Sequence, residues 1–426
     1  MKTNVLIAGC GCAGLYCALN LPKNLNVTII TKSDEESSDS FLAQGGMCVQ
    51  RDDEDFECFL EDTMRAGHYE NDKKSVELMI ENSRDVLSDL VSFGAEFNKN
   101  EDGTLAYTRE GAHSQKRIVF REDATGKEIT LTLLKEAKKR SNIQILEYTT
   151  LLDIIEKDEK CIGAVIRTKD GEVETVEADY TVLATGGVGG IYEHSTNFRH
   201  LTADAIAISA KHNIKLRDIT YVQIHPTTFY SNEDRSFLIS ESVRGEGAVL
   251  RDKNGNRFTN ELSPRDVLTK AIKEQMEKDG TEFVWEDLTT IDNKTLNEHF
   301  PNILAHCKEN GYDAAREWIP VVPAQHYFMG GVWVNYESKT SLDKLYAVGE
   351  TACNGVHGKN RLASNSLLES LVFSKRAAKD IEKNYEFENS YGEYIKTLGL
   401  EEYKDAEKLE EEYKNIAKNI IREGNK

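Results

Sequence analysis

Arginine and histidine residues in four short motifs have the chemistry to bind an acid. Arg265 stands in SPRD, Arg361 in GKNRLASNSLLE, His225 in QIHPT and His326 in QHYFMGG. A guanidinium group binds a carboxylate through two hydrogen bonds, so a pair of arginines suits a small substrate with two carboxylates. Both histidines border irregular backbone and could project into a cleft. The alternative is that the arginines lie on the surface and that the histidines have only a structural role. Single residues of these types are found in such positions more often than in binding sites.

The charge of the chain makes local clusters of cations necessary. The 426 residues carry a formal net charge of -20, and 39% of them are hydrophobic. An excess of negative charge argues against a nucleic-acid partner and repels an anionic substrate at long range. An acid-binding site must therefore concentrate its own positive charge.

Cysteine usage and hydropathy bear on the cofactor class and the location. The eight cysteines are scattered, without the paired spacing of a zinc site or an iron–sulfur cluster. No apolar run approaches the roughly 18 residues that span a bilayer, and no basic leader precedes the first strand. We therefore expect reduced thiols, no metal, and a soluble, cytoplasmic protein without a membrane segment.

A glycine-rich turn near the start has the spacing of a phosphate-binding loop. An apolar strand over Asn4–Ala8 leads into GCGCAG and a helical run over Ala13–Leu21. The first glycine allows a tight turn, the second lets backbone N–H groups approach a pyrophosphate, and the third lets the helix pack on the strand. The pattern predicts a dinucleotide site at Gly9, Gly11 and Gly14, with an ordinary tight turn as the alternative.

Three further segments bear on which dinucleotide would bind. The second strand, Val27–Ile30, is followed by Thr31 and Lys32 and lacks the acidic residue that holds an NAD ribose. SFLAQGG at Ser40 has small residues that allow the backbone to approach a flat ring, although it could also be a polar loop. Ser364–Ser366 precede a helical run, where free N–H groups could face an electron-rich ring edge or simply cap the helix. These features make NAD the less favoured ligand.

The remaining chain divides into recognisable parts. Buried strands over Tyr180–Ala184 and Leu345–Val348 each end in a glycine turn, which indicates one sheet built from distant segments. The stretch between them from residue 219 to 326 is charged and mixed in pattern, as expected of an inserted domain. The tail is predicted to be amphipathic helix, because apolar residues recur there at helical spacing, namely Leu409, Tyr413, Ile416 and Ile420.

A series of motifs follows a fixed order along the chain. They are GCGCAG at Gly9, SFLAQGG at Ser40, ATGG at Ala184, HPTTF at His225, RGEG at Arg244, SPRD at Ser263, HYFMGGV at His326, LYAVGE at Leu345 and GKNRLASNSLLE at Gly358. Their order and spacing, over about residues 1–378, resemble the succinate dehydrogenase and fumarate reductase flavoprotein superfamily. Within it, YTREGAH at Tyr107, followed by Arg117 and DATG at Asp123, is most similar to the L-aspartate oxidase family.

The resemblance implies an α/β fold. We expect a Rossmann-like FAD-binding domain with an inserted α+β capping domain and a short helical C-terminal tail. The FAD-binding domain would comprise residues 1–218 and 327–378, the capping and substrate domain residues 219–326, and the tail residues 379–426. Family members usually end in a longer three-helix domain than this tail could form.

The resemblance also implies how FAD is held. A carboxylate at a strand end, as at Glu350, can accept hydrogen bonds from ribityl hydroxyls. Membrane-bound relatives tether FAD to a histidine where this chain has Asp39, so we expect non-covalent FAD. Where relatives have Gly-Asp-Gly, this chain has Ala203, Asp204 and Ala205, which restrict the backbone if either outer position needs a positive φ. The implied contacts are Gly9, Gly11, Cys12, Ala13, Gly14, Lys32, Asp39, Ser40, Ala43, Gln44, Gly45, Gly46, Asp204, Glu350, Ser366 and Leu367.

The substrate residues follow from the same resemblance. Arg265 would be the catalytic, proton-handling residue. A guanidine is a poor base, so it would need neighbours such as Glu246 or Asp266, or it could act by electrostatics alone. The substrate carboxylates would be held by His225, His326 and Arg361, with Glu241 beside them and with Ser240 where the family usually has threonine.

Glu110 would distinguish an amino acid from a plain dicarboxylate. Its carboxylate could form a charge-assisted hydrogen bond with an α-ammonium group, which succinate lacks. A buried glutamate left unpaired would cost on the order of several kcal/mol, so succinate and fumarate would be disfavoured. The alternative is a surface ion pair with Arg109 or Arg117.

The activity implied by the resemblance is oxidation of L-aspartate to iminoaspartate, the first step of quinolinate and NAD biosynthesis. Hydride would pass from C2 of the amino acid to flavin N5. Oxygen, fumarate or a quinone could reoxidise the flavin, and quinolinate synthase would be the downstream partner. The nearest rival is a soluble fumarate reductase or succinate dehydrogenase flavoprotein, against which Glu110 and Asp39 count. A flavin-binding redox partner or sensor without a substrate of its own is the rival from another class.

Overall fold

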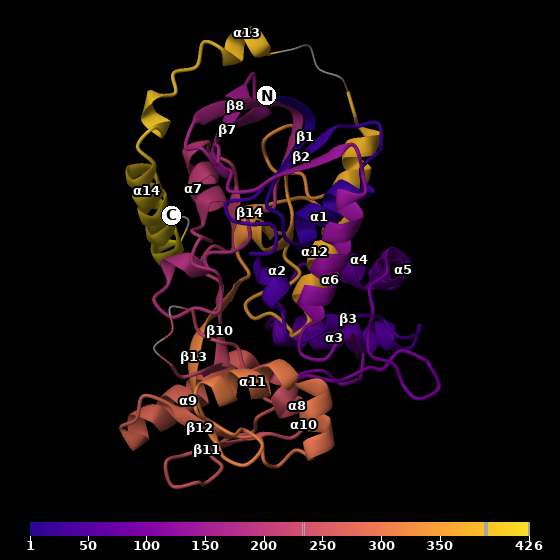
Figure 1. The fold of residues 1–426 in the computed structure, drawn as a ribbon, viewed down its shortest axis with the longest axis vertical. Coiled ribbons are helices and arrows are strands. Elements are labelled where there is room, and N and C mark those ends of the chain that lie inside the picture. Colours follow the sequence, from indigo (N-terminus) through magenta and orange to yellow (C-terminus); the bar gives the residue numbers. More distant parts are fainter. Residues whose placement is uncertain (232, 234, 387–390, 425–426) are drawn as a thin grey trace.

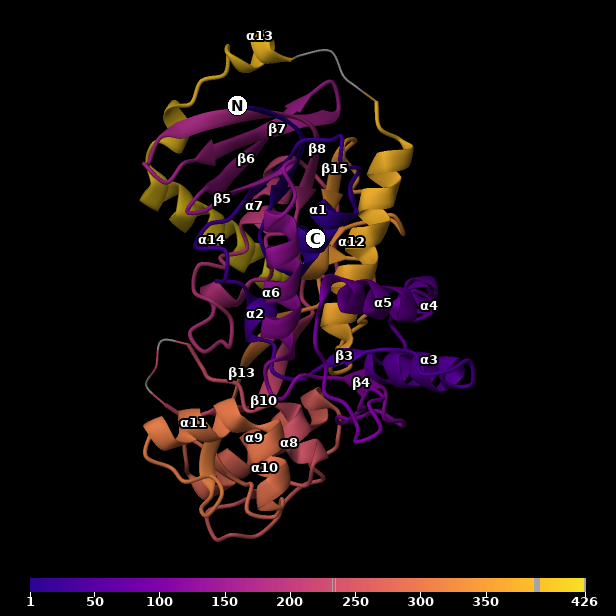
Figure 2. The same ribbon diagram turned by 45° about the vertical axis from the view of Figure 1, so that its right-hand side comes forward.

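A mostly parallel sheet forms the centre of the structure, a computed structural model that describes residues 1–231, 233, 235–386 and 391–424. Its path is β5-β2-β1-β8-β7-β6, and β15 pairs with the end of β8 (Figures 1 and 2). The β1, β2, β5, β8 and β15 strands are parallel, whereas β6 and β7 add an antiparallel extension. The bounds are β1 Lys2–Ala8, β2 Val27–Ile30, β5 Ile143–Leu146, β6 Thr150–Lys157, β7 Lys160–Arg167, β8 Val173–Leu183 and β15 Leu345–Ala347.

Both faces of this sheet are buried, because its side chains alternate between two apolar cores. Along β1, Ile7 packs into one core and its neighbours Leu6 and Ala8 into the other. The first core includes α1 (Cys12–Asn20), α6 (Thr125–Lys138) and α12 (Asn365–Lys383), and the second includes α7 (Asp204–Lys211) and α14 (Ala406–Glu423). The glycine turn between β1 and α1 therefore lies at the carboxyl edge of a rigid sheet, as the sequence predicts.

Helices from the first third of the chain extend the first core. The α4 and α5 helices lie against α12, which belongs to the far end of the sequence (Figure 2). Short strands complete the connections to the sheet. The bounds are α2 Asp39–Leu42, β3 Met47–Cys48, α3 Asp55–Ala66, α4 Lys73–Glu81, α5 Ser83–Phe93, β4 Ile118–Val119, η1 Gly189–Ile191, β9 Leu216–Arg217, β14 Gly331–Trp333, η2 Gly349–Thr351 and β16 Ala352–Cys353.

The predicted insertion is a separate lobe at one end of the molecule (Figures 1 and 2). Its antiparallel sheet has the order β10-β13-β12-β11, and it has its own apolar core, which includes Phe229, Leu268 and Val321. The long strands β10 and β13 enter and leave the lobe side by side. The bounds are β10 Val222–Phe229, α8 Glu241–Gly245, β11 Val249–Arg251, α9 Arg265–Asp279, β12 Val284–Asp287, α10 Asn293–His299, α11 Pro301–Glu309 and β13 Ile319–Phe328.

The tail is helical, as predicted, and α14 lies along α7 (Figure 1). The tail also contains α13 (Gly392–Ile395) and η3 (Glu401–Tyr403). The buried stripe of α14 is rotated slightly from the predicted one: Leu409 and Tyr413 are buried, but Ala417 and Ile421 are more deeply buried than Ile416 and Ile420. Among the described helices, none is long and apolar enough to cross a membrane.

Candidate active site

One cavity of about 370 Å³ joins the glycine turn to the arginine and histidine motifs. It lies where the central sheet, α2 and the inserted lobe meet. Of the residues predicted from the sequence, only Cys12 and Gly14 do not line it. The lining includes Gly9, Gly11, Ala13, Lys32, Asp39, Ser40, Ala43, Gln44, Gly45, Gly46, Glu110, Asp204, His225, Ser240, Glu241, Arg265, His326, Glu350, Arg361, Ser366 and Leu367.

The glycine turn has the close packing that a phosphate-binding loop requires. Gly9 has φ +125°, and a Cβ there would lie 1.9 Å from the carbonyl oxygen of Ala184. A Cβ at Gly14 would lie 2.0 Å from the carbonyl oxygen of Gly9, so the helix rests directly on the strand. The backbone N–H of Cys12 donates to Ser40 Oγ at 3.2 Å. Gly14 and Cys12 thus shape the turn from behind the cavity wall.

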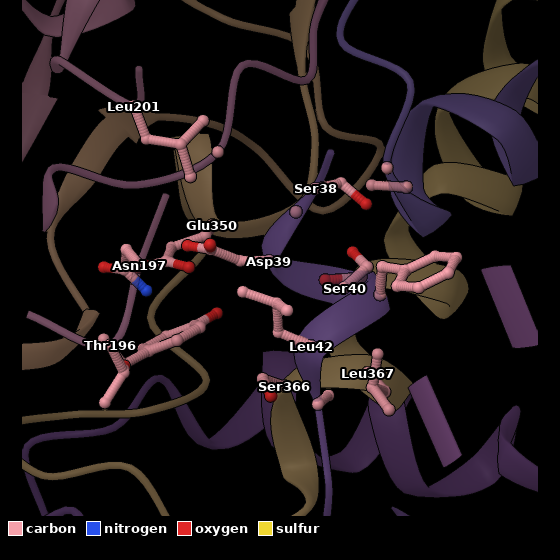
Figure 3. Close-up of a pocket in the computed structure, with 18 of the residues that line it drawn as sticks. Ser38, Asp39, Ser40, Leu42, Thr196, Asn197, Leu201, Glu350, Ser366 and Leu367 are labelled. Carbon is pink, nitrogen blue, oxygen red and sulfur yellow. The ribbon is translucent and has the colours of Figure 1, made fainter. Parts of the chain in front are cut away.

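Polar side chains around α2 fit a ligand with many hydroxyl groups, such as FAD. The buried atoms Ser38 Oγ, Asp39 Oδ2 and Gln44 Oε1 have no hydrogen-bond partner within the described part of the chain. Such atoms are costly unless a ligand or water satisfies them. Ser38 and Ser40 lie on one side of the cavity and Thr196 and Asn197 on the other (Figure 3). The residues present therefore fit the expected cofactor.

Two carboxyl groups, Asp39 and Glu350, lie close together in this cavity (Figure 3). The Asp39 Oδ1 atom accepts a hydrogen bond from Phe198 N at 2.9 Å, and Glu350 Oε1 accepts one from Phe328 N at 2.8 Å. Burial raises the pKa of Asp39 to about 7. Burial and the neighbouring Asp39 raise the pKa of Glu350 to about 8. Position 39 carries a carboxyl group in place of the histidine to which FAD would be tethered, which agrees with the expected non-covalent FAD.

Lys32 and Asp204 form an ion pair at one edge of the cavity. Lys32 Nζ lies 2.9 Å from Asp204 Oδ2 and donates to Thr202 Oγ1 at 2.7 Å. The lysine follows β2 and the aspartate begins α7, so the pair joins segments about 170 residues apart in sequence. Lys32, which stands where NAD-binding proteins have an acidic residue, thus already forms an ion pair with a carboxylate.

The alanine that replaces the first glycine of the usual Gly-Asp-Gly sequence has a left-handed backbone. Ala203 has φ 64° and ψ 28° at the N-cap of α7, whereas Ala205 lies within the helix. A residue with a Cβ is strained in this region by about 1–2 kcal/mol. The concern raised by the sequence therefore applies to Ala203 alone.

Arg265 and Arg361 approach each other through a shared acceptor, Gln223. The amide oxygen of Gln223 accepts from Arg265 Nη1 at 2.8 Å and from Arg361 Nε at 3.2 Å. The Gln223 Nε2 atom donates to the carbonyl oxygen of Arg361 at 2.8 Å. Burial and the charge of Arg265 lower the pKa of Arg361 to about 10, which leaves it charged at neutral pH. The two guanidinium groups therefore form one cationic centre, buried from solvent.

The two histidines lie together in the cavity wall. Their ring centroids are 5.0 Å apart, with the rings nearly perpendicular. Burial, with the charges of Arg265 and His326, lowers the pKa of His225 well below 6.5, and burial with Arg361 and Arg265 does the same for His326. His326 Nδ1 lies 2.7 Å from Thr196 Oγ1, and His225 Nε2 has no partner among the residues the structure describes. Both rings are neutral at pH 7 and can serve as hydrogen-bonding groups rather than as charges.

Glu110 is buried in the cavity wall, 4% exposed, and the alternative of a surface ion pair is wrong. Arg109 is exposed, and Arg117 forms ion pairs with Asp55 at 2.8 Å and Asp62 at 2.7 Å. Burial and the neighbouring Glu241 raise the pKa of Glu110. A buried carboxyl group beside another carboxylate is poised to bind a cation.

The partner of Arg265 differs from the two neighbours expected from the sequence. Arg265 Nε donates to Glu241 Oε2 at 2.6 Å. Asp266 instead pairs with His68 at 2.9 Å, and Glu246 lies 3.6 Å from His299. Burial raises the pKa of Glu241, but the positive charges of Arg265 and Arg244 lower it. The net effect is a pKa below the usual value for glutamate. Residues 265 and 266 point in different directions because they are successive positions at the start of α9.

Several residues of the site were not predicted from the sequence. Gln223 stands two residues before His225, and both are buried while Val222 and Ile224 are half-buried, so strand periodicity could have identified it. Ser364 makes no cap bond to α12; it lines the cavity, and its hydroxyl donates to Glu110 Oε2 at 2.5 Å. No local signal indicates Ser242 or Arg235. Across the described residues, no cluster of His, Cys, Asp and Glu could hold a metal ion, and the eight cysteines are free.

Comparisons with known proteins identify the family of the chain. Residues 4–367 match the family described as FAD binding domain. The chain is 49% identical to a protein named L-aspartate oxidase from Clostridium perfringens over 380 residues, which cover 89% of this chain and 86% of that protein. It is 48% identical to a protein of the same name from Clostridium acetobutylicum, with 91% and 89% covered.

A solved structure of E. coli quinol fumarate reductase is similar in fold, with a TM-score of 0.88 and 29% sequence identity over 94% of this chain and 74% of that one. The fold, the cavity and the extent of these matches lead to one conclusion. The chain belongs to the L-aspartate oxidase family of proteins with an FAD-binding domain.

Proposed function

We propose that the protein oxidises L-aspartate to iminoaspartate with non-covalently bound FAD, the first step of quinolinate and NAD biosynthesis. The observation that carries this proposal is that Glu110 lines the same cavity as Arg265, Arg361 and two neutral histidines. A substrate that satisfies all of them has two carboxylates and a positive charge. L-aspartate has these groups, and succinate and fumarate lack the ammonium group.

The binding of substrate is divided among charged and neutral groups. In the proposal, Arg361 and Arg265 supply positive charge to the carboxylates, and His225 and His326 contribute hydrogen bonds. Glu110 receives the α-ammonium group in a charge-assisted hydrogen bond. Ser240 and Glu241 border the same space. All of these side chains except His326, which is half-buried, are buried, and their burial excludes water and strengthens each interaction.

Proton transfer is assigned to Arg265 with Glu241 as its partner. FAD, when bound, supplies the acceptor for the hydride that leaves C2 of the amino acid. Glu241, at 2.6 Å from Arg265 Nε, stabilises the guanidinium and offers a site for a proton passed from it. This pairing replaces the role first considered for Glu246 and Asp266. A purely electrostatic role of Arg265 would leave Glu241 as a counter-ion only.

FAD is proposed to lie along the glycine turn and α2. Gly9, Gly11 and Gly14 shape the backbone at the pyrophosphate, with the N-terminus of α1 beside them. The unsatisfied polar atoms of Ser38, Asp39 and Gln44 support this assignment. Lys32, Asp204 and Glu350 are proposed contacts in the cavity wall. The proposed set is completed by Ser40, Ala43, Gly45, Gly46, Ser366, Leu367, Cys12 and Ala13.

The setting of the reaction is part of the proposal. Oxygen or fumarate is the proposed electron acceptor, and quinolinate synthase the functional partner that uses the reactive product. Eight free cysteines are in keeping with a cytoplasmic location.

We also propose domain boundaries of 1–218 and 327–378 for the FAD-binding domain, 219–326 for the capping domain and 379–426 for the tail. The separate apolar core of the inserted lobe supports this division.

Anaerobic reduction of the flavin tests the function. The FAD-loaded protein is mixed with L-aspartate, with succinate or with buffer, and flavin absorbance is followed. Bleaching by L-aspartate alone supports the proposal. Bleaching by succinate and not by L-aspartate identifies a succinate dehydrogenase or fumarate reductase type of flavoprotein. Absence of bleaching by either acid indicates a redox partner without a substrate of its own. Reoxidation of the reduced protein by oxygen or by fumarate then identifies the acceptor.

A further inference from the structure

Ser242 makes a hydrogen bond to the proposed specificity residue from outside the cavity. Its hydroxyl donates to Glu110 Oε1 at 2.6 Å, yet Ser242 is not among the residues that line the cavity. Ser242 belongs to the first turn of α8 in the inserted lobe, whereas Glu110 belongs to the loop before β4. The contact joins residues 132 positions apart. Ser242 therefore reaches the substrate space only through Glu110.

A network of hydrogen bonds fixes the Ser242 hydroxyl. The Ser240 hydroxyl donates to Ser242 Oγ at 3.2 Å, which leaves the Ser242 proton directed at Glu110. The backbone N–H of Ser242 donates in turn to Ser240 Oγ at 3.2 Å, so the two serines hold each other at the start of α8. A buried hydroxyl that both accepts and donates has little freedom to rotate.

The second oxygen of Glu110 is held from another part of the fold. Ser364 Oγ donates to Glu110 Oε2 at 2.5 Å and accepts from Gly46 N at 3.1 Å. A Cβ at Gly45 would lie 2.6 Å from Glu110 Oε1, so the carboxylate also packs closely against the backbone of the predicted cofactor loop. One serine from the inserted lobe and one from the FAD-binding part thus hold the carboxylate in a single orientation.

The two hydroxyls also act on the charge of Glu110. Burial and the nearby Glu241 raise its pKa, and the hydrogen bonds from Ser242 and Ser364, together with the positive charge of Arg265, oppose that rise. A hydroxyl that donates to a carboxylate stabilises its charged form. The loss of either donor would leave Glu110 more often protonated and unable to pair with an ammonium group by charge.

We propose that Ser242 is a positioning residue for amino-acid specificity, which orients Glu110 toward the α-ammonium group of the substrate and keeps it ionised. This inference rests on the proposed function, because it assumes that Glu110 receives the ammonium group. Ser242 touches neither substrate nor cofactor in this role. It adds to the recognition of L-aspartate and contributes nothing to the binding of a dicarboxylate without an amino group.

Three variants test the proposal in the FAD-loaded protein. Ser242→Ala removes the hydroxyl, Ser242→Thr retains it, and Ser75→Ala is the matched control. Ser75 is also a buried serine in the first turn of a helix, but its hydroxyl donates to the Asn354 carbonyl at 2.7 Å, away from the cavity. The measurements are KM and kcat for L-aspartate across pH, and the dissociation constant of succinate from its effect on the flavin spectrum.

We expect Ser242→Ala to raise KM for L-aspartate by about tenfold to a hundredfold, the effect of losing a hydrogen bond to a charged group. The dissociation constant of succinate should stay within about twofold, because its binding does not use Glu110 as a charge partner. The acidic limb of kcat/KM should move to higher pH. Ser242→Thr should restore both, and Ser75→Ala should change neither. An equal loss for L-aspartate and succinate, or no change in Ser242→Ala, would overturn the proposal.

A measurement on the FAD-free protein separates this inference from the proposed function. The infrared carbonyl band of protonated Glu110 is identified by its loss in Glu110→Gln. Its titration should shift to higher pH in Ser242→Ala and return in Ser242→Thr. An unshifted titration refutes the role of Ser242 whatever the substrate is. If the titration shifts but L-aspartate does not reduce the wild-type flavin, the hydrogen bond is real and the proposed function, with the specificity role that rests on it, is wrong.

Discussion

Replacing Ala203 with glycine should relieve strain at the start of α7, and Ala205→Gly is its matched control. Ala203 has φ 64°, where a Cβ costs about 1–2 kcal/mol. Ala205 has no such strain and lies within the helix, where glycine costs about 1 kcal/mol relative to alanine. Both methyl groups are buried, so either change loses a similar apolar contribution of about 0.8 kcal/mol. The cost of glycine within the helix is mainly the greater freedom of the unfolded chain, and Ala203→Gly increases that freedom by the same amount.

These shared terms cancel in the comparison of the two variants. We expect Ala203→Gly to be more stable than Ala205→Gly by about 1–2 kcal/mol, with Ala203→Gly close to wild type. Urea unfolding of the FAD-free proteins, followed by fluorescence and compared at the midpoint, measures the difference. An equal loss of stability in the two variants would refute the assignment of strain to Ala203. The same result would show that the left-handed conformation is not enforced in solution.

Three further predictions follow from the charges in the cavity. Glu110→Gln keeps the size of the side chain but removes its charge. The kcat/KM for L-aspartate should therefore fall by about tenfold to a hundredfold, while succinate binding is retained. Equal kcat/KM values in the variant and the wild type would exclude an ionic role of Glu110. Gln223→Glu places a carboxylate between Arg265 and Arg361. This carboxylate should compete with the substrate and raise KM for L-aspartate by about tenfold or more. An unchanged KM would show that these arginines do not bind the substrate. Burial raises the pKa of Asp39 from 3.8 to about 7, so its contribution to stability is complete below pH 4 and is lost as pH rises through 7. Unfolding of the FAD-free protein should therefore show a smaller loss of stability between pH 5 and pH 7 in Asp39→Asn than in wild type, with about 1.4 kcal/mol per pH unit as the upper limit for one group. Identical losses would mean that Asp39 is ionised in the folded protein.

Short-range patterns predicted the elements that hold the cofactor. The strand over Val27–Ile30 has the predicted bounds, and the helix after the glycine turn begins within one residue of its predicted start. These features depend on local steric preferences and on the periodicity of apolar residues, which a sequence displays directly. The ordered motifs identified the rest, and nearly all residues inferred from them line one cavity.

Contacts between distant residues could not be predicted in the same way. Glu246 and Asp266 are neighbours of the catalytic motifs in sequence, yet Glu241 is the residue that meets Arg265. The direction of a side chain at the start of a short helix depends on how that helix packs, and a shift of one residue turns it by about 100°. The choice of partner was therefore decided by tertiary packing in the inserted lobe, where α9 lies against β10.

By itself the sequence determined the glycine turn, the sheet that carries it and the residues now found along one cavity, from which acid-binding residues are proposed. Tertiary structure decided how these residues are tuned: Gln223 holds two arginines together, and serines from two lobes orient Glu110. The reason is physical. Residue type and spacing fix local backbone geometry, but the charge state and orientation of a buried side chain depend on burial and on partners that only the folded chain brings within hydrogen-bonding distance.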